Sequence, residues 1–295
     1  MGFTSVIFAL IAATAWGITD FAAALASAKI GHFRTAYISQ AIGTIAILLI
    51  SFGSLGLVMR FPLATCMTIG LGLLNVVAVL ASYKSFETGK LSLVSPLQSS
   101  FPALSTVLAI LFLGEEVSAT RAAGVVLTLG GIVIVTMQNN SEEIKGSNKS
   151  KIDKLGLGLG YAVIAFLAYG FLYFALKIVV IDLGPLIPVL IQRLATVSIL
   201  AITFSVSRQK TAGDFKSWRS FGLLLVIGLL DVLAGLAYNF GVIGGEVAVV
   251  STISGLYSVV TVLLAIIFLK DRLNRRQAGG ILAILVGVGL LGFAG

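Results

Sequence analysis

Ten apolar runs of about 19 to 24 residues, separated by short polar gaps, constrain this chain more than any other feature. A helix needs roughly 20 apolar residues to cross a bilayer, so each run is long enough to span it. A content of 58% hydrophobic and 11% charged residues excludes an ordinary soluble domain. The sequence therefore predicts an all-α integral membrane protein with ten transmembrane helices. The expected spans are 4–26, 35–58, 64–84, 91–113, 119–137, 156–177, 185–206, 220–242, 247–269 and 276–294.

Lysine and arginine are distributed unequally between the two sides of the expected membrane. Of the 20, sixteen follow odd-numbered spans, three follow even-numbered ones, and Arg193 lies inside the seventh span. Because basic loops stay in the cytoplasm, we expect both termini outside the cytoplasm, in a multi-pass protein of the cell (inner or plasma) membrane. The net charge of +8 thus reflects cytoplasmic loops and indicates no nucleic-acid partner. The three exceptions are Arg60, Arg121 and Lys177.

The chain also contains an internal repeat. A shift of 156 residues aligns 72–131 with 228–287 without a gap, and 19 of these 60 pairs are identical. The sequence predicts a first five-helix repeat at 1–137, a polar cytoplasmic linker at 138–154 and a second repeat at 155–295. Because five is odd, the second copy enters the membrane from the opposite side, which gives a 5+5 inverted-topology repeat. Such repeats are characteristic of secondary transporters with a site near the midplane.

Several segments resemble the EamA-like family of the drug/metabolite transporter superfamily. They are Trp16-Gly17, the stretch from Tyr83 to Pro96, and 111–135 with its counterpart 267–291. The resemblance implies a ten-helix carrier that moves small metabolites without ATP through a central cavity lined by both copies. The second copy has diverged, because Pro96 corresponds to Thr252 and Gly114-Glu115-Glu116 to Lys270-Asp271-Arg272.

Three charged residues lie inside expected spans: Asp20, Arg193 and Asp231. Charges in a bilayer are costly and usually face a cavity or a partner, so we expect a functional role, with a structural ion pair as the alternative. Asp231 could exchange a proton or pair with a substrate ammonium, while Arg193 could hold a substrate carboxylate. We expect Asp231→Asn to leave folding intact, to abolish transport or its pH dependence, and to harm the protein more than Asp20→Asn.

Further polar and aromatic residues recur on matching helix faces in the two copies. We expect the third, fourth, eighth and ninth spans, with the first and sixth, to line a cavity, and the fifth and tenth to pack outside it. Asn75 should face Asp231 and Gln98 should face Ser254 across it. The serines could instead serve helix packing. The remaining candidate cavity residues are Trp16, Gln40, Tyr83, Tyr169, Gln192, Tyr238, Asn239 and Tyr257.

The sequence indicates a transporter and not an enzyme. It has one cysteine and one histidine, no phosphate-binding loop, and no feature that indicates a cofactor, a metal or an obligate protein partner. We expect a secondary active transporter, an exporter of small metabolites such as amino acids or related compounds, that works by alternating access with a route for proton coupling. The alternatives are a flippase for lipids or lipid-linked headgroups and a non-transporting membrane scaffold.

Overall fold

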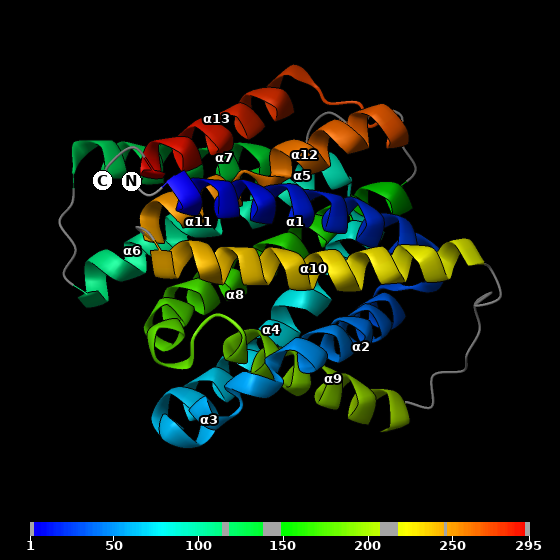
Figure 1. The fold of residues 1–295 in the computed structure, drawn as a ribbon. Coiled ribbons are helices and arrows are strands. Elements are labelled where there is room, and N and C mark those ends of the chain that lie inside the picture. The colour runs from blue at the N-terminus through cyan, green and yellow to red at the C-terminus, as the bar shows by residue number, and fades with distance from the viewer. Residues whose placement is uncertain (1–2, 114–117, 138–148, 207–217, 245–246, 293–295) are drawn as a thin grey trace.

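The computed structural model describes residues 3–113, 118–137, 149–206, 218–244 and 247–292, and these residues form only helices, turns and short connections (Figure 1). The elements are α1 (Phe3–Ile30), α2 (His32–Ser51), η1 (Phe52–Ser54), α3 (Gly56–Arg60), α4 (Pro62–Thr88), α5 (Leu91–Ser99), α6 (Phe101–Leu113), α7 (Ala119–Met137), α8 (Lys149–Leu183), α9 (Ile187–Val206), α10 (Trp218–Gly244), α11 (Val247–Gly255), α12 (Tyr257–Leu264), the π-helical turn η4 (Ala265–Leu269) and α13 (Arg275–Gly292).

Within the described ranges, eight segments are long and apolar enough to cross a membrane, where the sequence predicts ten spans. The fifth and tenth expected spans correspond to α7 and α13, which are not among the eight. Of α7, the residues Ala122–Val135 form an apolar helix that is shorter than a membrane span. α8 begins at Lys149, so residues 149–154 of the expected linker are helical, and its part at 138–148 lies outside the described residues.

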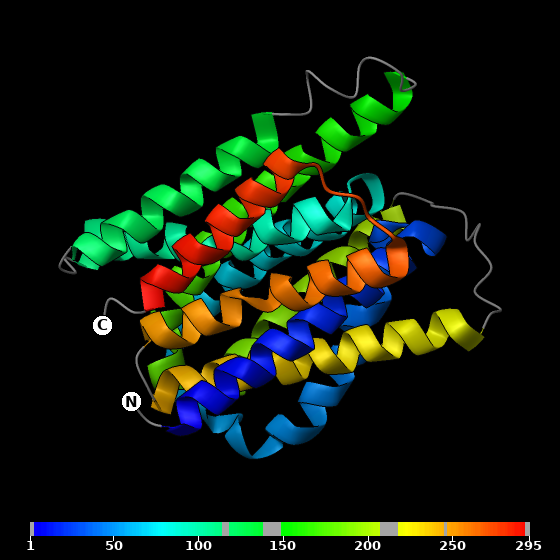
Figure 2. The ribbon, with the colours of Figure 1, turned by 90° about the horizontal axis from the view of Figure 1, so that it is seen from above.

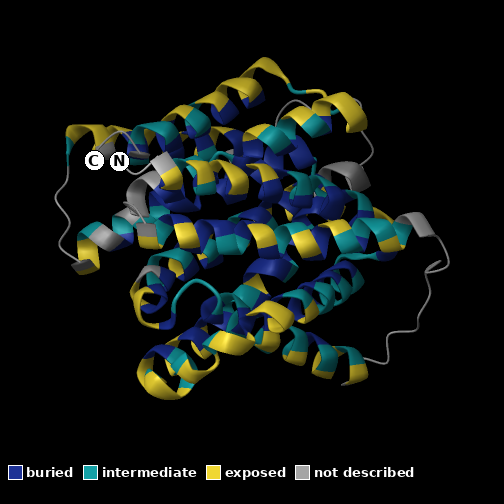
Figure 3. Ribbon diagram, viewed as in Figure 1, coloured by how far each residue is buried: buried dark blue, intermediate teal, exposed yellow. Residues whose placement is uncertain are grey.

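The surface and the interior have the reverse of a soluble protein's polarity. Figure 3 shows exposed residues along the outward faces of the helices, and many are large and apolar, such as Leu49 at 74% and Ile181 at 78% exposure. The interior contains fully or nearly buried polar side chains, including Gln40, Gln98 and Arg193. This arrangement suits a protein whose outer surface faces lipid tails and whose polar groups satisfy one another inside.

The fourth and ninth expected spans are each broken in two, which the sequence analysis did not predict. α5 ends before Ser100 and α11 ends before Leu256, and these two residues are 156 positions apart. In the first copy, Pro102 has no N–H and its ring would clash with the carbonyl of residue 98 in a continuous helix. The second copy has Gly255 at the break, and a methyl group there would lie 2.8 Å from Pro102 Cγ. The two breaks therefore pack against each other, and Ser99 donates a hydrogen bond to Ser258 across them (2.7 Å).

Helices from the two halves of the chain alternate in the bundle. α1 packs along α10, α4 along α8, and α7 along α13 (Figures 1 and 2). The α7–α13 contact depends on glycines: Cβ atoms at Gly124 and Gly131 would lie 2.8 and 2.7 Å from the carbonyl oxygens of Gly287 and Gly280. The start of α1 and the end of α13 lie at the same end of the bundle (Figures 1 and 2). Each of these three contacts thus joins one half of the chain to the other.

Candidate substrate cavity

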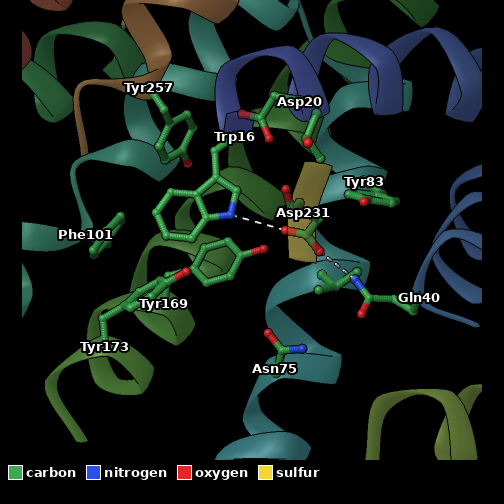
Figure 4. A pocket seen from close by; sticks show the side chains of 13 residues that line it. Trp16, Asp20, Gln40, Asn75, Tyr83, Phe101, Tyr169, Tyr173, Asp231 and Tyr257 are labelled. Atoms are coloured by element: carbon green, nitrogen blue, oxygen red, sulfur yellow. Dashed lines mark hydrogen bonds between the residues drawn. The ribbon is translucent and has the colours of Figure 1, made fainter. Parts of the chain in front are cut away.

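A cavity of about 70 Å³ lies in the interior between helices of both halves (Figure 4). This volume holds several water molecules, since one water needs about 10–15 Å³ measured in this way. α1, α2, α4, α6, α8, α10 and α12 contribute its lining, and none of the described lining residues belongs to α7 or α13. The lining residues are Trp16, Thr19, Asp20, Gln40, Asn75, Val79, Ser82, Tyr83, Phe101, Tyr169, Tyr173, Asp231 and Tyr257.

A second cavity, of about 60 Å³, adjoins the first. It is lined in addition by residues of α9 and of the last turns of α10. Five residues line both cavities: Trp16, Gln40, Asn75, Tyr173 and Asp231. The residues found only in the second cavity are Leu176, Val189, Gln192, Arg193, Gly235, Tyr238 and Asn239. The shared residues therefore form the wall between two neighbouring polar spaces.

A hydrogen-bonded ion pair occupies this wall. The Asp231 carboxylate accepts hydrogen bonds from Arg193 (2.8 Å), from Gln40 Nε2 (3.2 Å) and from the Trp16 indole N–H (3.2 Å). Arg193 also donates to Gln40 Oε1 (3.1 Å), so Asp231, Arg193 and Gln40 form a closed ring of contacts. Arg193 is 5% exposed. The structure thus places the expected charged residues of the seventh and eighth spans in direct contact, each neutralising the other.

Gly43 provides the space for the Arg193 guanidinium. A Cβ atom at Gly43 would overlap that guanidinium and would lie 2.9 Å from the carbonyl oxygen of Gly228. Gly228 is similarly crowded, since its own Cβ would lie 2.7 Å from the Ser39 carbonyl oxygen. Two glycines, each one turn away from a network residue, Gln40 or Asp231, therefore let α2 and α10 cross closely with the arginine side chain against them.

Asp20 is the other carboxyl group of the first cavity, and its surroundings are different. Its Oδ2 accepts one hydrogen bond (3.0 Å), from Ser95 on α5, which is the first half of the broken fourth span. Among the described residues it forms no ion pair. The neighbouring Thr19 is 3% exposed, and its hydroxyl has no hydrogen-bond partner there. The cavity therefore contains one carboxyl group with a cation and one without.

Aromatic rings make up much of the remaining wall. Trp16 contacts the rings of Tyr173, Tyr238 and Tyr257 with centroids 5.7 to 6.0 Å apart, and Tyr173 stacks on Phe101 at 4.5 Å. In Figure 4 the carboxyl groups of Asp20 and Asp231 lie on one side of the Trp16 ring, and Tyr169 and Tyr173 lie below it. Rigid aromatic walls with a few polar groups are typical of small-molecule sites.

Twelve of the fourteen candidate residues named from the sequence line one cavity or the other. Asn75 and Asp231 both line the wall, although Asn75 donates to Thr196 (3.0 Å) and not to Asp231.

The expectation that Gln98 and Ser254 face each other across the cavity is wrong. Gln98 is fully buried, and its amide forms hydrogen bonds with Ser82 and Ser85 (both 2.6 Å). Ser254 is also buried and donates a hydrogen bond to the Ala9 carbonyl on α1 (3.5 Å).

The internal repeat holds a signal for the lining residues that the sequence analysis missed. Tyr173 corresponds to Asp20, since Trp16 aligns with Tyr169 at the same offset of 153, and Phe101 corresponds to Tyr257 at the offset of 156. Taking the repeat partner of each candidate would have added both residues. Ser82 carries the same signal, because it corresponds to the candidate Tyr238 at the offset of 156, whereas Thr19 and Val79 have no candidate as a repeat partner.

The sequence model of the EamA-like transporter family matches residues 3–137 and again residues 156–293. The chain is also 29% identical over 136 residues to an uncharacterised protein of Methanocaldococcus jannaschii, an alignment that spans 46% of this chain and 98% of that protein. A solved crystal structure shares the fold, with a TM-score of 0.68 and 14% identity over 97% of this chain and 95% of the other. The two family matches together cover most of the sequence, and the chain therefore belongs to the EamA-like transporter family, as a multi-pass membrane protein of the drug/metabolite transporter type.

Proposed function

We propose that the protein is a secondary active transporter that exports small metabolites, such as amino acids or related compounds, across the cell membrane by alternating access. The observation that carries this proposal is the pair of cavities separated by the Asp231–Arg193–Gln40 network. A carrier needs a site that opens to one side at a time, with a barrier that can move. Here the barrier consists of side chains from α2, α9 and α10, which can part without unfolding a helix.

The proposal includes ten membrane-crossing helices in a 5+5 inverted repeat. The exchange of contacts between the halves supports it. At the offset of 156, Gly124 corresponds to Gly280 and Gly131 to Gly287, and the contacts are Gly124 with Gly287 and Gly131 with Gly280. A reciprocal pattern of this kind is what a two-fold axis produces. The archaeal relative, which aligns over 98% of its length with under half of this chain, supports a duplicated unit.

The same geometry gives a physical route for switching. The equivalent breaks at Ser100 and Leu256 meet in the bundle, and broken helices in transporters supply hinge points and free backbone groups near the substrate. Since Ser95 on α5 bonds to Asp20, a movement of this half-helix changes the cavity directly. Proton coupling is part of the proposal because the two carboxyl groups, Asp20 and Asp231, are groups that a proton can neutralise.

The structure offers less for a flippase. Headgroup binding would need an available basic site, and Arg193 already contacts Asp231 and Gln40. We therefore keep transport of a water-soluble compound as the proposed function.

Transport by reconstituted vesicles tests this proposal. Purified protein in proteoliposomes, loaded in turn with a panel of radiolabelled amino acids, amines and organic acids, should release at least one compound faster than empty liposomes do, and an imposed proton gradient should change that rate. A protein that releases no compound of the panel with or without a gradient would be a scaffold. For topology, we expect no signal from a reporter that is active only in the cytoplasm when it is fused after Gly295.

A further inference from the structure

The first cavity is lined by two carboxyl groups, Asp20 and Asp231, but the described residues supply only one cation near them. That cation, Arg193, pairs with Asp231. Arg193 lies 2.8 Å from Asp231 and donates its second contact to Gln40, so its charge is committed to the wall between the cavities. Asp20 has only the Ser95 hydroxyl as a hydrogen-bond donor among the described residues. A charge inside a membrane span costs at least roughly 2.5 kcal/mol, so an ionised Asp20 without a partner is unfavourable. The site therefore lacks one positive charge.

The cavity of Asp20 offers two acceptors that would suit a cation with N–H donors. The second carboxylate oxygen of Asp20 and the unpartnered hydroxyl of Thr19 are both acceptors at the same cavity. A primary ammonium group carries three N–H donors, and two acceptors of this kind use two of them. The buried Thr19 hydroxyl is an independent sign of a missing ligand, because such groups normally have a partner.

The aromatic wall of the cavity also attracts cations. Trp16, Tyr83 and Tyr257 line the cavity with Asp20, and the faces of such rings attract cations. Their apolar surface would also pack against the hydrocarbon part of a small ligand. A carboxylate ligand would find the opposite: two acidic side chains and no available basic group in the described lining.

We propose that Asp20 binds the ammonium group of a small primary organic amine and that a proton takes the place of the amine when the site is empty. The inference rests on the proposed transport function and names its substrate class. The charged and titratable groups that line the cavity with Asp20 are Asp231 of α10, which is paired with Arg193 of α9, and the tyrosines Tyr83 of α4, Tyr169 and Tyr173 of α8 and Tyr257 of α12. The tyrosines are uncharged and the ion pair is neutral as a unit, so Asp20 is the group whose charge the amine or the proton balances.

Three probes with one hydrocarbon body separate the charge classes. Isoamylamine is a cation, leucine a zwitterion and 4-methylpentanoate an anion, and none absorbs where tryptophan emits. The sequence has two tryptophans, so a Trp218→Phe protein leaves Trp16 of the cavity as the sole reporter. We expect isoamylamine to change the Trp16 fluorescence saturably and to bind at least tenfold more tightly than the other two. Its affinity should fall as the pH is lowered, because protons compete for Asp20.

Variants of the same protein test the role of Asp20. Asp20→Asn should weaken isoamylamine binding about tenfold to a hundredfold, which is what the loss of a charge-assisted hydrogen bond amounts to. Asp20→Glu should restore most of the affinity. Asp182→Asn, which removes an exposed carboxylate on α8, is the matched control and should bind like the parent. Thermal unfolding of each variant in detergent shows whether it is folded.

The outcomes distinguish this inference from the transport proposal. Tighter binding of leucine or 4-methylpentanoate, binding of none of the three probes, or full amine affinity in folded Asp20→Asn would overturn the amine site. A vesicle assay in which another compound class is moved would then leave the transport function standing. If Asp20→Asn does not fold, loss of amine binding in Thr19→Val with the stability of the parent keeps the test decisive: unchanged binding there contradicts the site.

Discussion

The two acidic residues of the cavity differ in what surrounds them. Asp231, where α10 crosses α2 and α9, accepts three hydrogen bonds and an arginine charge. Asp20, where α1 meets α5, the first half of the broken fourth span, accepts one hydrogen bond from Ser95. A fully compensated carboxylate stabilises a specific arrangement of helices, whereas an uncompensated one is available to a ligand or a proton. We therefore infer that the region around Asp231 serves structure and gating, and that the region around Asp20 serves binding.

The largest effect should come from removing the cation. Arg193→Gln leaves Asp231 charged and unpaired in the interior, and breaking a buried pair in this way costs about 3–5 kcal/mol. Thermal unfolding in detergent should therefore show a strongly lowered transition. The double variant Arg193→Gln/Asp231→Asn should recover much of the loss, because no unpaired charge remains. A single variant that unfolds like the parent would show that the pair is not structural.

A smaller effect should come from the glycine under the arginine. Gly43→Ala places a methyl group against the Arg193 guanidinium and 2.9 Å from the Gly228 carbonyl, and overpacking of this kind costs about 1–3 kcal/mol. Gly70→Ala is the control, since a Cβ on that α4 glycine has no neighbour within 4 Å. The control should unfold at or slightly above the parent temperature. Equal behaviour of the two alanine variants would argue against the close α2–α10 crossing.

The smallest effect concerns the serine that holds Asp20. Ser95→Ala removes the single described donor to this carboxyl group, so we expect isoamylamine binding to weaken about fivefold, equivalent to about 1 kcal/mol, with little change in stability. Ser99→Ala is a matched change on the same half-helix that removes the bond to Ser258. Fluorescence titration should show Ser99→Ala within about twofold of the parent, and a reversed order of the two variants would place the binding site elsewhere.

Much of this organisation could be predicted from the sequence. Apolar runs and their boundaries locate most of the helices, because a bilayer demands a fixed length of apolar chain. The repeat and the scarcity of intramembrane charges single out Asp20, Arg193 and Asp231. The same logic identifies Trp16 and Gln40, which the structure places beside Asp231.

Other features depend on contacts between helices and could not be predicted. The sequence shows that α9 and α10 carry opposite charges, but the rotation of each helix decides whether Arg193 reaches Asp231 or a ligand. The break at Leu256 has no proline of its own and becomes understandable only where Gly255 meets Pro102. The prediction that Gln98 faces the cavity was wrong because an amide inside a helix bundle can either face a cavity or bond to neighbouring side chains. Here it forms hydrogen bonds with Ser82 and Ser85.

The most direct test compares the stabilities of Asp231→Asn and Asp20→Asn in the absence of any ligand. The ion pair changes the expectation drawn from the sequence, since Asp231→Asn now leaves Arg193 buried without a counter-charge. We expect its unfolding free energy to fall by about 3–5 kcal/mol, whereas Asp20→Asn should be as stable as the parent or more stable, because this substitution leaves no described cation without its counter-charge. The measurement is thermal unfolding of the two purified variants beside Asp182→Asn. Loss of stability in Asp20→Asn as large as that in Asp231→Asn would contradict the division between a structural and a binding carboxylate.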